Sequence, residues 1–199
     1  MYIFDMNTVC PENVLESIRT RVRAHHALYE HLTIKDKYWE HTLSNAFRDG
    51  GYACKWDVES HEVGKDIVVT GVDYPRISCK SGILQYSKRT LAIKRLQISG
   101  FRTTALKTIE EKLNYIDGNH EDAVFSLSSS LFKSHRKYVL TIFLPPVFKE
   151  LSWVHDGKNY KSNTANGVSA TIRSACSDQL WYEIDYNSPL ILQKHDICI

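Results

Sequence analysis

Helical hydrophobic patterns occupy the first fifty residues. Apolar side chains recur at helical spacing after Pro11, and a second such run extends from Asp36 to the Gly50-Gly51 pair, which is typical of a helix end. The stretch 52–56 then alternates between larger apolar residues and others, so it predicts a short strand. The chain therefore opens with two helices and a strand.

A β-hairpin is predicted next, between the β-branched run 67–69 and a second extended run, 77–80. Three turn formers, a glycine, an aspartate and a proline, separate the two runs. If the turn is centred on Asp73, antiparallel pairing opposes Asp66 to Lys80, whose side chains then lie about 5 Å apart on one face. The hairpin therefore predicts a carboxylate and an amine side by side on neighbouring strands.

The same register opposes Val68 to Ser78 and sorts the side chains by face. Period-two alternation places Asp66, Ser78 and Lys80 on one face. The opposite face, predicted to be the core side, carries four apolar side chains: Ile67, Val69, Ile77 and Cys79. A register slip of one residue would reverse these faces.

The remaining pattern is less regular. It predicts extended structure near 91–96, a helix begun by a capping box at Thr108 and ended by Gly118, strands at 123–127 and 138–144, and a late strand at 180–186. The polar segment 155–167, rich in turn formers, is predicted as a plain connection unless the fold brings it beside a basic surface.

Composition favours one globular domain. A chain of 199 residues suits a single well-cored domain, and 43% apolar with 24% charged residues is typical of globular proteins. A net charge of +2 does not by itself indicate nucleic-acid binding, so any anion-binding surface depends on where the 25 Lys and Arg lie.

Cysteine usage and hydropathy point to a reduced, cytoplasmic protein. The five cysteines are scattered without a C-x-x-C pair, so neither a disulfide framework nor a zinc site is predicted. No stretch reaches the roughly 18 consecutive apolar residues that cross a bilayer, and the N-terminus lacks a basic-then-apolar signal pattern. We expect no membrane partner.

A family resemblance arises from the hairpin. Asp66, followed after eleven residues by Ser78-Cys79-Lys80, resembles the PD-(D/E)xK nuclease signature. In that superfamily an Asp begins one strand, and an acid-x-Lys triplet lies on its hairpin partner. The pattern KDIVV, turn, ISCKSG is most similar to type II restriction endonucleases. Ser78 departs from the family pattern, because Glu or Asp is usual at that position.

The resemblance implies a fold. It is a mixed α+β (α/β) fold with a restriction-endonuclease-like αβββαβ core, in which helices flank a central mixed sheet. We expect one domain over 1–199, with the nuclease core at about 36–144. The extension 145–199 is then expected to supply recognition or dimerisation elements.

The resemblance also implies a site for Mg²⁺. Asp66 and the backbone carbonyl of Cys79 are the expected oxygen ligands, and Lys80 is expected beside the attacking water and the scissile phosphate. Ser78 cannot supply a carboxylate's charge, although its hydroxyl can hold a metal-bound water. The structural alternative is an isolated cross-strand salt bridge between Asp66 and Lys80.

Another acid is therefore expected to compensate for Ser78. Glu40 is the first choice, because a Glu on the helix before the hairpin often reaches the metal in this superfamily. Glu62 is the second choice and Asp73 the third. The alternative for Glu40 is an ordinary surface contact.

A basic run follows the hairpin. Five cations lie within fifteen residues, interleaved with aromatic and hydroxyl side chains: Lys88, Arg89, Lys94, Arg95 and Arg102, with Thr103 and Thr104. Such a set suits phosphate and base-edge contacts in DNA, and the alternative is a solvated face.

These expectations combine into one predicted function. It is a Mg²⁺-dependent, site-specific endonuclease of double-stranded DNA, similar to type II restriction enzymes and acting as a homodimer, since two-fold symmetry lets one site cut both strands of a palindrome. The alternatives are a DNA-binding module of the same fold that has lost catalysis, and a DNA-repair or junction nuclease.

Overall fold

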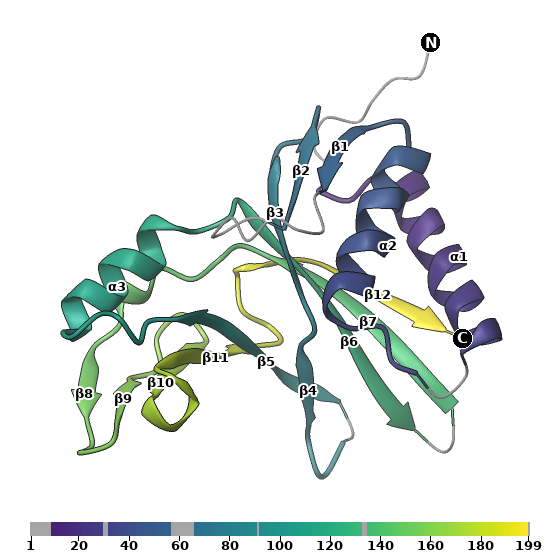
Figure 1. Cartoon of the computed structure of the whole chain (residues 1–199). Coiled ribbons are helices and arrows are strands. Elements are labelled where there is room, and N and C mark those ends of the chain that lie inside the picture. The colour runs from purple at the N-terminus through teal and green to yellow at the C-terminus, as the bar shows by residue number, and fades with distance from the viewer. Residues whose placement is uncertain (1–8, 30–31, 57–65, 91, 133–134, 199) are drawn as a thin grey trace. The chain divides into compact units, whose positions relative to one another are not determined.

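A computed structural model of the chain shows two compact units, each with its own β-sheet (Figure 1). The structure describes residues 9–29, 32–56, 66–90, 92–132 and 135–198. The first unit combines Met1–Ser81, Glu121–Leu144 and Leu192–Ile199, and the second combines Gly82–His120 and Pro145–Ile191. Each unit is therefore assembled from segments that are distant in sequence.

The first unit consists of two helices and a six-stranded sheet. The helices are α1 (Glu12–Leu28) and α2 (Asp36–Asp49). The sheet order is β1-β2-β3-β6-β7-β12, with bounds β1 Ala53–Trp56, β2 Ile67–Thr70, β3 Arg76–Lys80, β6 Ala123–Phe132, β7 His135–Phe143 and β12 Ile191–Cys198. The pairs β1–β2, β2–β3 and β6–β7 are antiparallel, and β3–β6 is parallel, so the sheet is mixed.

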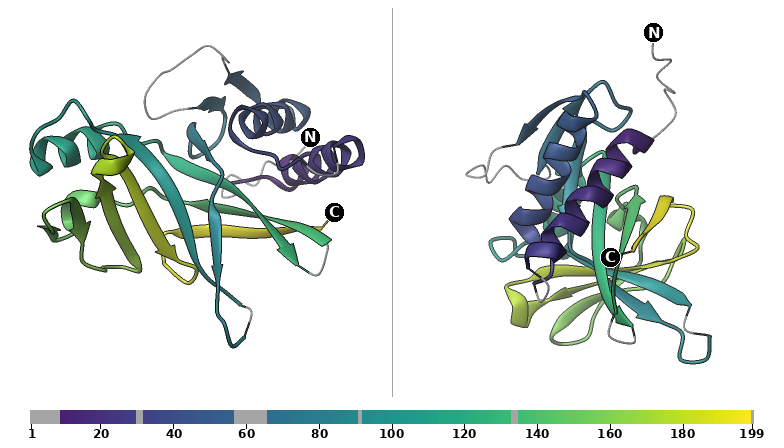
Figure 2. Two further views of the ribbon diagram at one scale, coloured as in Figure 1. Left: turned by 60° about the horizontal axis from the view of Figure 1, so that its bottom comes forward. Right: turned by 90° about the vertical axis from the view of Figure 1, so that its right-hand side faces the viewer.

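Amphipathic packing explains why the helices lie beside each other, as Figure 2 shows. Each helix buries apolar residues at helical spacing: Val14, Leu15, Ile18 and Val22 in α1, and Trp39, Leu43, Ala46 and Phe47 in α2. A Cβ atom at Gly50 would lie 2.8 Å from Val14, so only glycine allows this close approach at the end of α2. The Trp39 indole also donates to the Phe125 carbonyl at 2.9 Å, which fixes α2 on the sheet.

The second unit has a sheet order β4-β5-β11-β10-β9-β8, entirely antiparallel. Its elements are β4 Ile83–Tyr86, β5 Ile93–Arg102, α3 Ile109–Gly118, β8 Trp153–His155, β9 Asn159–Ser162, β10 Val168–Arg173 and β11 Gln179–Asp185, with short 3-10 helices at Phe148–Glu150 and Ser174–Cys176. The Tyr182 ring of β11 packs against the Phe148 ring, with centroids 5.2 Å apart.

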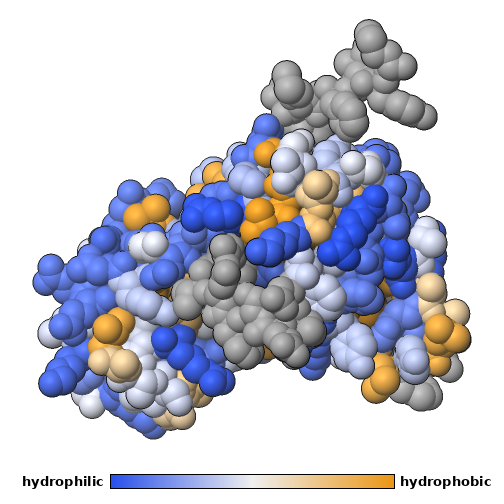
Figure 3. Space-filling model, turned by 45° about the horizontal axis from the view of Figure 1, so that its top comes forward, coloured by the Kyte–Doolittle hydropathy of each residue, from blue (hydrophilic) through white to orange (hydrophobic). Residues whose placement is uncertain are grey.

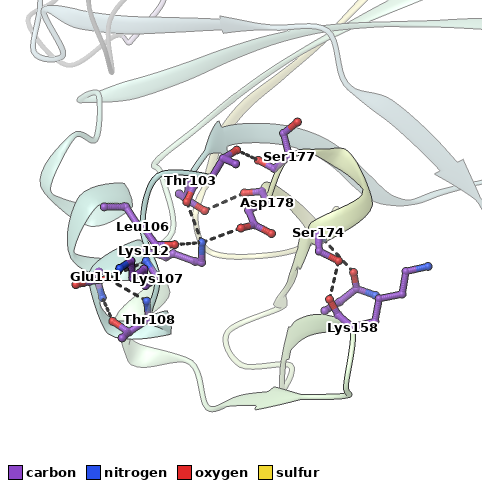
Figure 4. Close-up of polar contacts among 12 residues, drawn as sticks. Thr103, Leu106, Lys107, Thr108, Glu111, Lys112, Lys158, Ser174, Ser177 and Asp178 are labelled. Atoms are coloured by element: carbon purple, nitrogen blue, oxygen red, sulfur yellow. Dashed lines mark hydrogen bonds and ion pairs between the residues drawn. The ribbon is translucent and has the colours of Figure 1, made fainter.

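Local rules explain α3, whose contacts appear in Figure 4. Thr108 accepts a hydrogen bond from the Glu111 backbone N–H, and the Glu111 carboxylate accepts one from the Thr108 N–H, so the predicted capping box is confirmed. Lys112 of this helix is buried and donates to three oxygens of the same unit.

The mixed α+β class, both N-terminal helices and the hairpin are confirmed. The expected core at about 36–144 coincides with neither unit, because 82–120 belongs to the second unit and the first unit also takes in α1 and β12. The segment 145–199, expected as an extension, supplies strands to both sheets. Part of 155–167, predicted as a plain connection, forms β9.

Surface and cysteine chemistry agree with a globular protein. Hydrophilic side chains cover most of the face drawn in Figure 3, and apolar ones occur there in small groups. In the described part of the chain, no helix is long and apolar enough to cross a membrane. Cys10, Cys54, Cys79 and Cys176 are free thiols.

Candidate active site

The observed hairpin register differs from the predicted one by two residues. Ile67 pairs with Ile77 and Val68 with Arg76, so the predicted partners Lys80 for Asp66 and Ser78 for Val68 were wrong. The turn closes earlier than Asp73 implied, because Gly71 adopts φ +87°, a conformation that favours glycine. An even shift preserves side-chain faces, whereas a shift of one residue would have reversed them.

Asp66 therefore lies opposite Ser78, just before β2, and its Oδ2 atom accepts two hydrogen bonds and forms an ion pair. The Asp66 backbone N–H donates to the Ile77 carbonyl at 3.0 Å, which fixes its position on the strand pair. Oδ2 accepts from the Cys79 backbone N–H at 2.5 Å and from the Ser78 hydroxyl at 3.1 Å. Its distance to Lys80 Nζ is 3.6 Å. The carboxylate and the ammonium thus converge, as the face pattern predicted.

The Asp66–Lys80 pair is neither fully buried nor fully exposed. The Lys80 side chain is 30% exposed and that of Asp66 25% exposed. Asp66 is the one ion-pair partner recorded for Lys80 among the described residues, although an ammonium has three N–H donors. Lys80 therefore has donors to spare for a ligand.

Ser78 and Cys79 stabilise the position of the carboxylate. Ser78 is buried, and its hydroxyl donates to Asp66, so its proton is used within the protein. Burial, together with the nearby negative charges of Asp66 and Glu40, raises the pKa of the Cys79 thiol well above its usual range. The thiol therefore stays protonated, which leaves the backbone carbonyl of Cys79 as its expected contribution to a metal site.

Glu40 reaches the same site from α2. Its Oε2 atom accepts a hydrogen bond from the Trp56 indole N–H at 3.2 Å. Burial raises the pKa of Glu40, and the charge of Asp66 raises it further, while the Trp56 N–H and the charges of Lys80 and Lys37 oppose the rise. The Glu40 carboxylate therefore interacts electrostatically with both Asp66 and Lys80.

Trp56 is the site residue that the sequence analysis did not identify. Alternation placed it on the first strand, but its role depends on a contact between β1 and α2. A tryptophan at the end of a strand, with its N–H requiring an acceptor, was the available signal.

Of the other two candidate acids, Asp73 does not join this group. Asp73 is exposed in the hairpin turn, separated from Asp66 by the whole of β2, a distance on the order of 13 Å along the strand. Glu62 lies outside the described residues. No cluster of three or more His, Cys, Asp or Glu side chains suited to a metal ion occurs within residues 9–29, 32–56, 66–90, 92–132 and 135–198.

The carboxylates of Asp66 and Glu40 are the ligand type and number that a protein commonly offers Mg²⁺. Mg²⁺ keeps several waters and commonly binds proteins through one or two carboxylates together with substrate phosphate. The negative charge of Asp66 contributes to the raised pKa of Glu40, and a cation near both carboxylates would relieve that repulsion.

The seven predicted DNA contacts lie in the second unit and divide into two groups. Arg95 is paired with Glu183 at 3.0 Å and Asp185 at 3.6 Å, and the Thr103 and Thr104 hydroxyls donate to the carbonyls of Asp178 and Ser177. These three side chains are engaged within the fold, and Thr103 is buried. The other four are exposed: Lys88, Arg89, Lys94 and Arg102.

Comparison of the chain with protein-family models, with curated proteins and with solved structures finds no match.

Proposed function

We propose that the first unit carries a Mg²⁺-dependent phosphodiesterase site and that the protein is a site-specific endonuclease of double-stranded DNA, similar to type II restriction enzymes. The observation that carries this proposal is the convergence of three side chains from three segments: Glu40 from α2, Asp66 just before β2 and Lys80 at the end of β3. The PD-(D/E)xK resemblance expects the same arrangement of roles on a helix and a following hairpin.

Each residue has a role in this chemistry. Asp66 and Glu40 would hold Mg²⁺, with the Cys79 carbonyl as a third oxygen. When bound, the ion supplies a Lewis acid for the phosphate and favours deprotonation of water. Lys80 offers positive charge to the phosphate as negative charge accumulates there, and Ser78 orients Asp66 through its hydroxyl.

The alternative of an isolated salt bridge explains the pair less well. A salt bridge that only stabilises the sheet would not account for the unused N–H donors of the Lys80 ammonium. Exposed ion pairs also contribute only about 0–1 kcal/mol to stability. Glu40 of α2 adds a third ionisable group, and its pKa is raised by burial and by the charge of Asp66. Such a perturbed group beside a charged pair is typical of functional sites.

DNA binding would involve the exposed cations of the second unit. Lys88 and Arg89 lie between β4 and β5, while Lys94 and Arg102 lie on β5. Each can neutralise a backbone phosphate, which makes affinity fall with salt. Two copies of the chain would be needed to cut both strands of a palindromic site symmetrically.

Plasmid digestion tests the proposal. Purified protein with Mg²⁺ should linearise supercoiled DNA, and EDTA should prevent this. Asp66→Ala and Lys80→Ala should abolish cutting while gel-shift binding persists. Sequencing the ends should show one recurrent recognition sequence. A wild-type protein that leaves the DNA intact in Mg²⁺ and in Mn²⁺ would refute the endonuclease.

A second candidate function is a DNA-binding module without catalysis. The observation in its favour is Ser78, a hydroxyl where the resemblance expects an acid. Such a module would shift DNA in a gel and never cut it, and Asp66→Ala would change nothing. A repair or junction nuclease would instead cut at branched or damaged DNA irrespective of sequence, which mapping of the ends distinguishes.

A further inference from the structure

A small hollow lies on the first unit beside Glu40. It has a volume of about 210 Å³ and is lined by Lys37, Tyr38, His41 and Trp56. Three of these residues belong to α2 and the fourth ends β1. The volume is below the roughly 300–1,000 Å³ of ordinary small-molecule sites, so it suits a single ring system better than a whole cofactor.

The lining consists mainly of the rings of Tyr38, His41 and Trp56, of which Trp56 also packs against the hydrophobic core. The Tyr38 side chain is 71% exposed. The His41 and Trp56 rings lie with centroids 5.0 Å apart at an interplanar angle of 35°, and His41 Nε2 lies 2.8 Å from the Asn45 side-chain nitrogen. These rings offer flat apolar surfaces to a ligand, and little side-chain entropy is lost when the ligand binds, because the rings are already partly fixed.

The hollow is linked to the candidate active site through Trp56. Trp56, which lines the hollow, donates its indole N–H to Glu40, and Glu40 lies within electrostatic reach of Asp66 and Lys80. Lys37 adds a cation at the rim of the hollow. A group held in the hollow would therefore be attached to, or next to, whatever binds at Asp66 and Lys80.

We infer that this hollow binds one unstacked nucleobase of the nucleotide beside the scissile phosphate. The inference rests on the proposed function and deepens it, because it makes the preferred substrate a DNA in which one base is out of the stack at the cleavage point. A base has an apolar π-face for the Tyr38 and Trp56 rings and is joined to an anionic phosphate for Lys37 and Lys80. Stacking on aromatic side chains tolerates any base sequence.

Binding measured without cleavage tests the inference. Two duplexes would be compared in Ca²⁺, one with a single bulged 2-aminopurine and one with a bulged abasic nucleotide at the same position. The base should tighten binding about tenfold, and its fluorescence should be quenched on binding. Tyr38→Ala and His41→Ala should each remove most of that preference. Tyr29→Ala, which changes another exposed tyrosine of the same unit, should keep it.

The outcomes separate this inference from the endonuclease proposal. If the wild type prefers the base over the abasic duplex but never cuts DNA in Mg²⁺, the hollow is assigned correctly and the nuclease is not. If it cuts DNA but binds both duplexes equally, or if Tyr38→Ala keeps the preference with an unchanged melting curve, the base-binding assignment is overturned. Failure to bind either duplex also overturns it.

Discussion

Two lysines, one in each unit, show how a structural ion pair differs from a candidate functional one. Lys112 of the second unit has a side chain only 3% exposed. It donates to the Thr103 carbonyl at 2.8 Å, the Leu106 carbonyl at 2.6 Å and Asp178 Oδ2 at 3.0 Å (Figure 4). Lys80 of the first unit is 30% exposed and lies 3.6 Å from Asp66.

The number of satisfied donors separates the two. An ammonium has three N–H donors, and Lys112 uses them on three acceptors, so nothing is left for a ligand. Lys80 has one recorded ion-pair partner in the described chain, at a distance too long for a strong hydrogen bond. We therefore expect Lys112 to contribute to folding and Lys80 to contribute to binding and catalysis.

The largest expected effect comes from breaking the saturated pair. Lys112→Met removes the ammonium that donates to two carbonyls and to the Asp178 carboxylate, so the free energy of unfolding should fall by about 3 kcal/mol. Lys80→Met should change it by less than about 1 kcal/mol, because its pair is partly exposed. Urea denaturation measures both. Equal losses for the two variants would contradict the distinction.

Mn²⁺ binding should depend on the Asp66–Lys80 pair and not on the Lys112–Asp178 pair. Asp66→Asn removes a proposed carboxylate ligand and should weaken Mn²⁺ binding by about 100-fold, whereas Asp178→Asn, at the saturated pair, should leave it unchanged. Isothermal titration without DNA measures the affinities. Undiminished Mn²⁺ binding by Asp66→Asn would remove that residue from the metal site.

A milder change weakens the second unit without touching Lys112. Thr108→Ala deletes the capping side chain of α3 and should lower the free energy of unfolding by about 1 kcal/mol. Mn²⁺ affinity should remain at the wild-type value, because the residues of the proposed metal site belong to the first unit. Ser152→Ala, at an exposed loop position of the same unit, provides the control, and its unfolding curve should match the wild type.

The smallest expected effect is a displacement along the pH axis. The pKa of Glu40 is raised by burial and by Asp66, so this carboxyl gains a proton at a higher pH than an ordinary Glu. Mn²⁺ affinity should be constant above that pKa and fall up to tenfold per pH unit below it.

The Trp56 N–H lowers the pKa of Glu40, so Trp56→Phe should move this fall to higher pH. Glu40→Gln should eliminate it and leave a weaker affinity. Trp153→Phe, which changes a tryptophan of the second unit, should leave the profile in place. A displacement to lower pH in Trp56→Phe would contradict the assignment of this hydrogen bond.

Local pattern predicted the parts of the fold that depend on local rules. Helical spacing identified α1 and α2, and the Thr108 capping box identified α3. Period-two alternation placed Asp66 and Lys80 on one face. The predicted register was wrong by two residues, but a shift of two residues leaves each side chain on the same face. The error came from Gly71, whose positive φ moved the turn.

Contacts between segments that are distant in sequence could not be predicted from local pattern. Glu40 was predicted at the site only through the family resemblance, and Trp56, its hydrogen-bond donor, was missed because the contact joins a helix to a strand. The saturation of Lys112 depends on Asp178, sixty-six residues away. The assignment of 82–120 to a second sheet likewise depends on strands beyond residue 150.

The most direct test of the account is the single-turnover rate of DNA cleavage in Mg²⁺ by the wild type, Lys80→Met and Lys112→Met, at a temperature where all three are folded. We predict that Lys80→Met loses at least about 100-fold in rate, while Lys112→Met cuts at nearly the wild-type rate. Cleavage that depends on Lys112 and not on Lys80 would contradict the central claim.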